Sequence, residues 1–163
     1  AGATILFAEA AAYHAEWIRT RPQDYGAAVR TRVRVGTTLL ALDYLQAQRA
    51  RAVLVREARA LFLRCDVLLT PTVPLPAPRQ DADLITWPDG SHEDIRGATL
   101  RFTRPFNLLG FPAISVPCGF TPDGLPIGLQ LVGRPFDEPT VLRVAAAYEA
   151  ATAWARRRPP LTP

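Results

Sequence analysis

The stretch FTRPFNLLGFPAISVPCG, residues 102–119, contains a short apolar run, ISVPC, of the kind that buried β-strands show. A second run of this kind, IGLQLV, occupies residues 127–132. Between them lies TPDGL, residues 121–125, which is a strong turn signal because proline presets its own φ and glycine accepts a positive φ. We therefore predict two antiparallel strands that are joined by this turn.

Three helices are predicted on the N-terminal side of this strand pair, from apolar residues that recur every three or four positions. They cover residues 3–20, 27–35 and 39–63. Gly36 is expected to end the second helix, and Thr37 or Thr38 to cap the third. We expect the buried side of the third helix to consist of Leu42, Leu45, Val53, Leu54, Leu61 and Phe62.

The remaining elements are a strand, a long connection and a final helix. The apolar run at residues 66–70, which is bounded by proline, predicts a buried strand. Residues 71–101 are rich in Pro, Asp and Gly and lack periodicity, so we predict a long loop there. The sequence DEP at residues 137–139 suits a helix N-terminus, and the helix is expected to reach about Arg157.

Two residue types are missing from the chain. It has no methionine, so we expect it to be a portion of a longer polypeptide. All 19 basic residues are arginine, so no mechanism that needs a lysine amine can run on this chain alone. The formal net charge is +4, but the arginines are mixed with acidic residues along the predicted helices, which favours solvated helix faces over a nucleic-acid-binding surface.

Familiar signatures of catalysis, cofactor binding and metal binding are absent from the sequence. Ser115 and Cys118 have no base beside them, so we interpret both as structural. The acidic pair Glu93 and Asp94 lacks the spacing of a cation site and is expected to be solvated. We therefore expect no metal, no cofactor and no catalytic residue in this chain. The sequence has no apolar run of about 18 residues, so we predict no membrane span. We expect a reducing cytoplasm as the location.

Several motifs together closely resemble the C-terminal block of the amidase signature family. Residues 102–119 match its F-T-x-P-x-N-x-x-G-x-P-A-x-S-V-P-x-G stretch, and GLPIGLQ at residues 124–130 matches G-L-P-x-G-L-Q. The sequence DVLLTPT at residues 66–72 resembles the family's D-V-L-x-x-P-T strand, and AAAYE at residues 145–149 resembles its A-x-x-x-E element. The resemblance covers nearly the whole chain.

This resemblance implies the C-terminal part of an α/β/α sandwich with a mixed β-sheet, so we expect residues 1–163 to form a single partial domain. It also implies hydrolysis of a carboxamide C–N bond by a serine nucleophile, a second serine on a cis peptide and a lysine base. In the family, the two serines lie in a Gly/Ser-rich signature, and all three residues belong to a segment that precedes everything seen here. We therefore expect this chain to be inactive by itself and to have the N-terminal half of the same polypeptide as its partner.

The resemblance also implies candidate residues for the substrate pocket. They are Phe102, Thr103 and Asn107, on a loop that would line the pocket, although Asn107 and Gly110 could equally shape a turn. Arg32 aligns with an arginine that grips the substrate carboxylate in glutamine-using amidotransferase subunits; it could also be an ordinary surface arginine.

One departure from the family pattern bears on the reaction. Glutamine-using members have an aspartate where this chain has Leu100, and an apolar residue cannot pair with the substrate ammonium. We therefore favour an amidase acting on a small-molecule amide. One alternative is the C-terminal part of a glutamyl-tRNA(Gln)/aspartyl-tRNA(Asn) amidotransferase subunit, and another, outside the family, is an arginine-rich binding module. Neither nucleic acid nor membrane is expected as a partner, and the isolated chain is expected to self-associate through exposed apolar faces.

Overall fold

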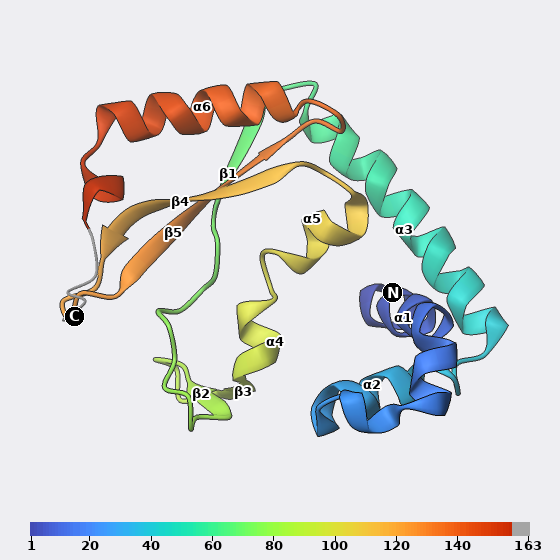
Figure 1. The fold of residues 1–163 in the computed structure, drawn as a ribbon. Coiled ribbons are helices and arrows are strands. Elements are labelled where there is room, and N and C mark those ends of the chain that lie inside the picture. The colour runs from blue at the N-terminus through green and yellow to red at the C-terminus, as the bar shows by residue number, and fades with distance from the viewer. Residues whose placement is uncertain (158–163) are drawn as a thin grey trace. The chain divides into compact units, whose positions relative to one another are not determined.

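The computed structural model describes residues 1–157, which form two compact units. Unit 1 comprises Ala1–Ala58, and unit 2 begins at Arg59. Helices and strands both contribute, as Figure 1 shows, and the α/β class expected from the sequence is confirmed. No helix in the described residues is long and apolar enough to cross a membrane.

Unit 1 is helical, and its elements lie close to the predicted positions. They are α1 (Gly2–Thr20), the 3-10 helix η1 (Pro22–Asp24), α2 (Ala27–Gly36) and α3 (Ala41–Leu61), whose last residues belong to unit 2. Helices α1 and α2 approach each other closely at Gly36, where an added Cβ would lie 2.0 Å from the carbonyl oxygen of Phe7. Gly36 therefore does more than end its helix, because its missing side chain lets the two helices touch.

Two predictions about α3 are wrong. Thr37 and Thr38 donate hydrogen bonds from their hydroxyl groups to the carbonyl oxygens of Arg34 and Val35, so they close α2 and do not cap α3. Of the apolar face expected to be buried, only Phe62 is buried. The exposed fractions of the other members range from 40% to 59%: Leu42, Leu45, Val53, Leu54 and Leu61.

Unit 2 is built around a three-stranded sheet in the order β1-β5-β4. The strands are β1 (Val67–Pro71), β4 (Ala113–Phe120) and β5 (Pro126–Gly133), and both pairings are antiparallel. The turn predicted at residues 121–125 is present: the Thr121 N–H donates to the Leu125 carbonyl at 2.8 Å, and Gly124 adopts φ 82°. The predicted strand pair and the strand upstream of it are therefore confirmed.

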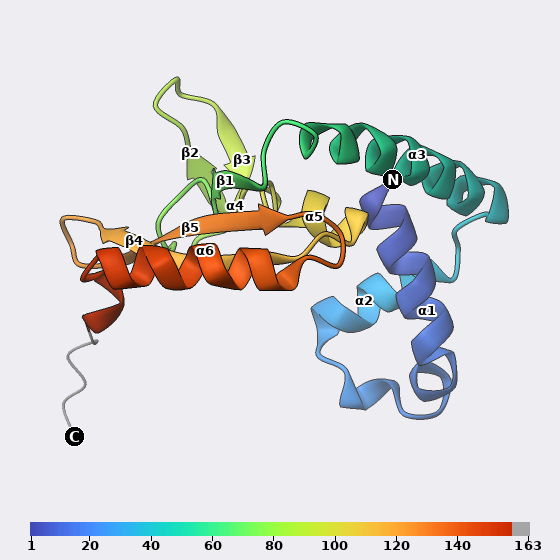
Figure 2. The ribbon, with the colours of Figure 1, turned by 90° about the horizontal axis from the view of Figure 1, so that it is seen from above.

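Helix α6 (Glu138–Ala151) covers one face of this sheet, along strands β4 and β5 (Figure 2). Val141 and Ala145 pack against Val116 and Leu131, and all four side chains are buried. The helix is shorter than predicted, because the α-helix ends at Ala151 and a separate 3-10 helix, η2 (Trp154–Arg156), follows. Helix α6 therefore covers one face of the sheet and leaves the opposite face free of this helix.

The connection predicted as one long loop contains regular structure. It includes the hairpin strands β2 (Leu84–Thr86) and β3 (His92–Asp94), followed by α4 (Ile95–Thr99). Downstream, residues expected to lie on a pocket-lining loop belong in part to α5 (Arg104–Leu109). The fold thus places short helices, rather than an extended loop, on either side of the FT segment, residues 102–103.

Candidate functional site

A polar row runs across the sheet face that α6 does not cover. Leu131 packs with α6, and side chains alternate between faces along a strand, so Gln130 points to the opposite face. Thr70 and Ser115 are the register partners of Gln130 on the two neighbouring strands, so their side chains share this face. The row thus has one residue on each of the three strands of the sheet.

Gln130 is the centre of this row. Its side chain is 4% exposed, and it is the one buried polar or charged residue in the described part of the chain. Its Nε2 group donates to the hydroxyl oxygen of Thr70 at 2.9 Å and to the backbone carbonyl oxygen of Phe102 at 3.1 Å. Gln130 therefore ties the sheet to the segment that precedes α5.

A second polar contact lies one step along the same face. The hydroxyl oxygens of Thr72 and Ser115 are 2.6 Å apart, and they meet above Gly128 of the intervening strand. A Cβ at Gly128 would lie 2.7 Å from the Thr72 hydroxyl and 2.8 Å from the Ser115 hydroxyl. Ser115 therefore forms a cross-strand contact that the absence of a side chain at Gly128 permits.

The candidate pocket residues Phe102, Thr103 and Asn107 fall at the start of α5 and within it. Thr103 is the N-cap residue by position, without a side-chain capping bond, and Asn107 is an exposed residue of the helix. Gly110 adopts a left-handed conformation, φ 73°, at the C-cap. The loop prediction is thus wrong for residues 104–107, because Pro105 suits the first turn of a helix and Gly110 its end.

Arg32, the remaining candidate, lies in α2 of unit 1. Its side chain is half-buried, and within the described residues its guanidinium makes no hydrogen bond or ion pair. Arg19 of the same unit differs from Arg32 in this respect, because its guanidinium forms an exposed ion pair with Glu16 at 2.9 Å. Arg32 thus keeps the planar donor group that carboxylate recognition would need.

The β2–β3 hairpin contains a cluster that sequence reasoning missed. Glu93 Oε2 accepts one hydrogen bond from Trp87 Nε1 at 3.0 Å and another from the Arg101 guanidinium. That guanidinium lies 5.3 Å from the centre of the Trp87 ring. A cavity of about 580 Å³ adjoins the three side chains. The turn sequence PDG at residues 88–90 could have indicated the hairpin.

The acidic residues of this connection have structural partners. Asp94, predicted to be solvated, caps α4 by accepting a hydrogen bond from the Gly97 N–H at 2.6 Å. Hydrogen bonds from the hydroxyl and backbone N–H of Ser91 lower the pKa of Asp89 below its usual value. Within residues 1–157, no group of three or more His, Cys, Asp or Glu side chains could hold a metal ion.

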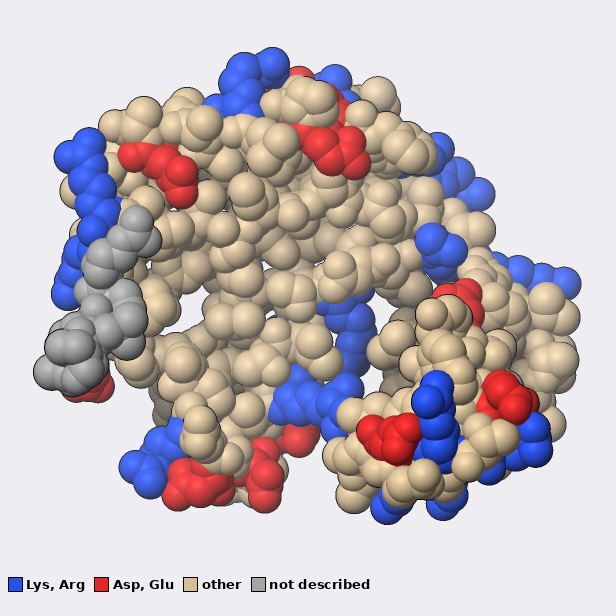
Figure 3. Space-filling view, viewed as in Figure 1, with Lys and Arg blue, Asp and Glu red and all other residues tan. Residues whose placement is uncertain are grey.

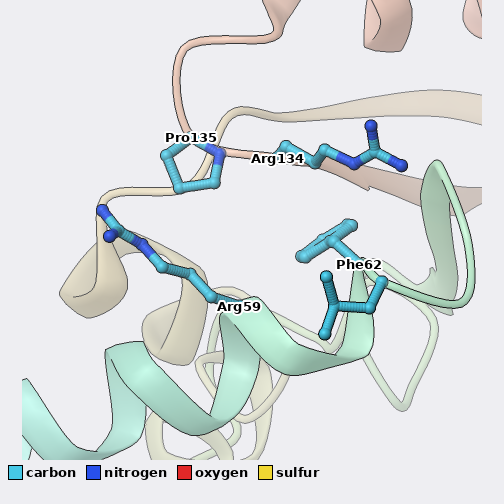
Figure 4. Close-up of a pocket in the computed structure, with 5 residues that line it drawn as sticks. Arg59, Phe62, Arg134 and Pro135 are labelled. Carbon is cyan, nitrogen blue, oxygen red and sulfur yellow. The ribbon is translucent and has the colours of Figure 1, made fainter.

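A second cavity, of about 420 Å³, lies at the end of α3 within unit 2 and is lined by Arg59, Phe62, Leu63, Arg134 and Pro135. Figure 4 shows the guanidinium groups of Arg59 and Arg134 pointing in opposite directions. Arg134 pairs with the carboxylate of Asp66 at 2.7 Å. The two arginines therefore do not converge on a common anion.

The charges visible on the surface are also mixed. On the face shown in Figure 3, both basic and acidic side chains are visible, spread over much of the surface. The exposed pair of Arg79 and Asp81, with a nitrogen–oxygen distance of 3.0 Å, is one example. This distribution does not favour a nucleic-acid-binding surface on that face.

Comparisons of this chain with known proteins point to one family. The family described as "Amidase" matches residues 3–142. An amidase of Pseudomonas putida is 45% identical over 157 residues, which cover 96% of this chain and 34% of that protein. A glutamyl-tRNA(Gln) amidotransferase subunit of Synechococcus sp. (strain JA-2-3B'a(2-13)) is 42% identical, over 88% of this chain and 28% of its own length.

Solved structures agree with the sequence comparison. An amidase crystal structure superposes with a TM-score of 0.83 at 32% identity, covering 91% of this chain and 34% of the solved one. The chain thus spans about a third of the length of the relatives that it matches.

Proposed function

The chain belongs to the amidase family, and from that premise we propose that it is the C-terminal portion of an amidase that hydrolyses carboxamide C–N bonds. The catalytic residues would be a serine nucleophile, a second serine on a cis peptide and a lysine base. They would lie in the part of the family's sequence that this chain does not span. The observation that carries the proposal is the 34% share of the Pseudomonas putida amidase that the chain covers. The absence of lysine supports it, because the proposed base must then lie elsewhere.

The contribution of this chain would be one wall of the substrate pocket and part of the central sheet. We assign the wall to Phe102, Thr103 and Asn107, because Gln130 holds the start of this segment against the sheet. Arg32 is the candidate for a carboxylate-binding group, since it is a half-buried residue whose guanidinium has no partner in the described residues. A small-molecule amide is the proposed substrate class.

The proposed partner of this chain is an N-terminal region of the same polypeptide. It would correspond to the roughly two thirds of the Pseudomonas putida amidase that this chain does not cover. Exposed apolar side chains along α3 would be covered by that N-terminal region, as would Leu69, which is 64% exposed on β1 at the edge of the sheet. The mixed sheet that the resemblance implies would then form by addition of strands to this edge. The proposed location is a reducing cytoplasm, in keeping with the free thiols of Cys65 and Cys118.

A hybrid enzyme tests this proposal. The region of the Pseudomonas putida amidase that precedes its matched segment would be joined to this chain and assayed for ammonia release from benzamide and propionamide. We expect turnover that serine-directed reagents abolish, and none from the chain alone. Clear turnover by the chain alone, or a folded hybrid without turnover, would contradict the proposal. The unaltered Pseudomonas enzyme serves as the reference.

The second candidate is an amidotransferase subunit, favoured by the 42% identity to the Synechococcus protein. Leu100 argues against it, because leucine cannot pair with the ammonium group of glutamine. A hybrid with the N-terminal region of the Synechococcus protein would be assayed for glutaminase activity, with and without Leu100→Asp. Activity that appears only with aspartate would support the amidase assignment, whereas activity with leucine would favour the amidotransferase. The arginine-rich binding module, an alternative outside the family, is not supported, because the chain belongs to the amidase family.

A further inference from the structure

Gln130 occupies a position where one side chain links three parts of unit 2. It lies on the central strand β5, its Nε2 group donates to Thr70 on β1, and the same group donates to the Phe102 carbonyl ahead of α5. We infer that Gln130 is a positioning residue that sets where the Phe102–Asn107 wall stands relative to the sheet. This inference rests on the proposed function only in calling that segment a pocket wall.

The chemistry of the two acceptors explains why an amide is needed. The Phe102 carbonyl oxygen can only accept a hydrogen bond, so the NH₂ end of the Gln130 amide must face it. The second N–H of the same group then reaches the Thr70 hydroxyl at 2.9 Å. A glutamate carboxylate of nearly the same shape would place an acceptor against the carbonyl, and a methionine would leave both acceptors without their donor.

Burial makes this pair of hydrogen bonds consequential. Gln130 is 4% exposed, so water cannot readily replace a lost donor at this position. The backbone on either side of Phe102 has its own bonds: the Arg104 N–H donates to Leu100 at 3.0 Å, and the Asn107 N–H donates to Thr103 at 3.2 Å. Both bonds join residues within the segment that contains the two short helices. The Gln130 side chain, in contrast, attaches this segment to the sheet.

Hydrogen exchange of the purified chain tests the inference. In Gln130→Met, we expect protection of the Arg104 and Asn107 amides to fall by about tenfold to a hundredfold, the range that corresponds to losing buried hydrogen bonds. The sheet amides of β5 should keep their protection. The carbonyl carbon resonance of Phe102 should also move upfield, because that oxygen loses its donor.

Two further variants complete the design. Gln130→Glu, at a pH where the carboxyl group is ionised, should lower protection of the wall at least as much as methionine does. Thr72→Val is the matched control: it removes a cross-strand contact on the same face without touching Phe102, so the wall should stay protected. Unchanged protection of the wall in Gln130→Met would overturn the inference. Loss of protection throughout unit 2, or failure to fold, would overturn it too, because Gln130 would then serve general stability.

These readouts do not depend on catalysis. If the hybrid enzyme is inactive but the Gln130 variants loosen the wall selectively, the proposed function fails and the positioning role stands. If the hybrid is active but exchange at the wall is unaffected by Gln130→Met, the proposed function stands and the positioning role fails.

Discussion

The hydroxyl oxygens of Thr72 and Ser115 lie 2.6 Å apart on the sheet face that α6 leaves uncovered, directly over Gly128. The contact joins Thr72, the residue that follows β1, to Ser115 of β4 across the intervening strand. It can form only because Gly128 has no side chain, since a Cβ there would lie within 2.8 Å of both oxygens.

Gly128→Ala should therefore destabilise unit 2. The new methyl group must push apart the Thr72 and Ser115 side chains, and overpacking of this kind costs about 1–3 kcal/mol. Urea unfolding measures the change in free energy. Adding Ser115→Ala should recover part of the loss, because it removes one of the two atoms that clash. Gly119→Ala is the control, since its Cβ would meet nothing closer than 4.0 Å.

The same reasoning applied to unit 1 predicts that Gly36→Ala has a larger effect. Its Cβ would lie 2.0 Å from the Phe7 carbonyl oxygen and 2.7 Å from the Ala11 Cβ, and the first of these atoms is backbone that cannot rotate away. We expect a loss of about 3 kcal/mol or more in the free energy of unfolding of this unit, the upper end for overpacking. Circular dichroism during urea titration would record it.

Gly26→Ala is the matched variant for that experiment. Gly26 has open space around it and precedes the same helix as Gly36. It should cost less than about 1 kcal/mol, the scale of a changed N-cap residue. Equal losses for the two variants would contradict the packing role of Gly36.

The strand pair and the N-terminal helices could be predicted from the sequence because each carries its own local signal. The turn at residues 121–125 has proline and glycine at suitable positions, and α1 has apolar residues at helical spacing. The partners of these elements could not be predicted in the same way. Leu42 and Leu45 have the spacing of a buried face, yet they are 59% and 54% exposed, since periodicity does not say which chain segment provides the cover.

The candidate site shows the same limit at shorter range. The FT segment could be recognised, but its tie to the sheet depends on Gln130, which lies 28 residues away from Phe102. The β2–β3 hairpin was missed because its strands are three residues each and β3 reads His-Glu-Asp, without apolar alternation. Contacts between distant residues, such as Trp87 and Arg101, stabilise such strands, and no local pattern reports them.

The hairpin cluster supplies a third prediction. Glu93→Ala should lower the free energy of unfolding by about 1–3 kcal/mol, because the Trp87 indole N–H and the Arg101 guanidinium lose a shared charged acceptor that is 28% exposed. Asp81→Ala removes an acid from an ion pair whose members are 69% and 83% exposed, and it should change stability by less than about 1 kcal/mol. Thermal melts followed by tryptophan fluorescence would separate the two. Similar losses would show that the cluster is no more than a surface ion pair.

Asp89 supplies a prediction about pH. Hydrogen bonds from the Ser91 hydroxyl and N–H lower its folded-state pKa, so its contribution to stability is present above the unfolded-state pKa and is lost as pH falls through the folded-state pKa. Ser91→Ala should raise the pKa of Asp89 toward its ordinary value. The pKa of Asp81, which is lowered by Arg79, should stay where it is. A carboxyl-carbon NMR titration measures both groups, and an unchanged Asp89 would refute the role of the hydroxyl.

Exposed apolar side chains near the end of α3 lead to a prediction about self-association. Leu63 and Phe136 are 87% and 91% exposed, and Leu63 and Pro135 line the same cavity, so the two large side chains belong to one region of unit 2. Burying them between copies of the chain would release apolar surface from water. We expect the isolated chain to sediment as oligomers and the Leu63→Ser/Phe136→Ser variant to shift toward monomer. Leu84→Ser, which alters a 63% exposed leucine of the hairpin, should leave the oligomers intact. A monodisperse monomer with a cooperative melt would exclude this use of the surface, and the N-terminal region of the family would then not be needed to keep the chain soluble.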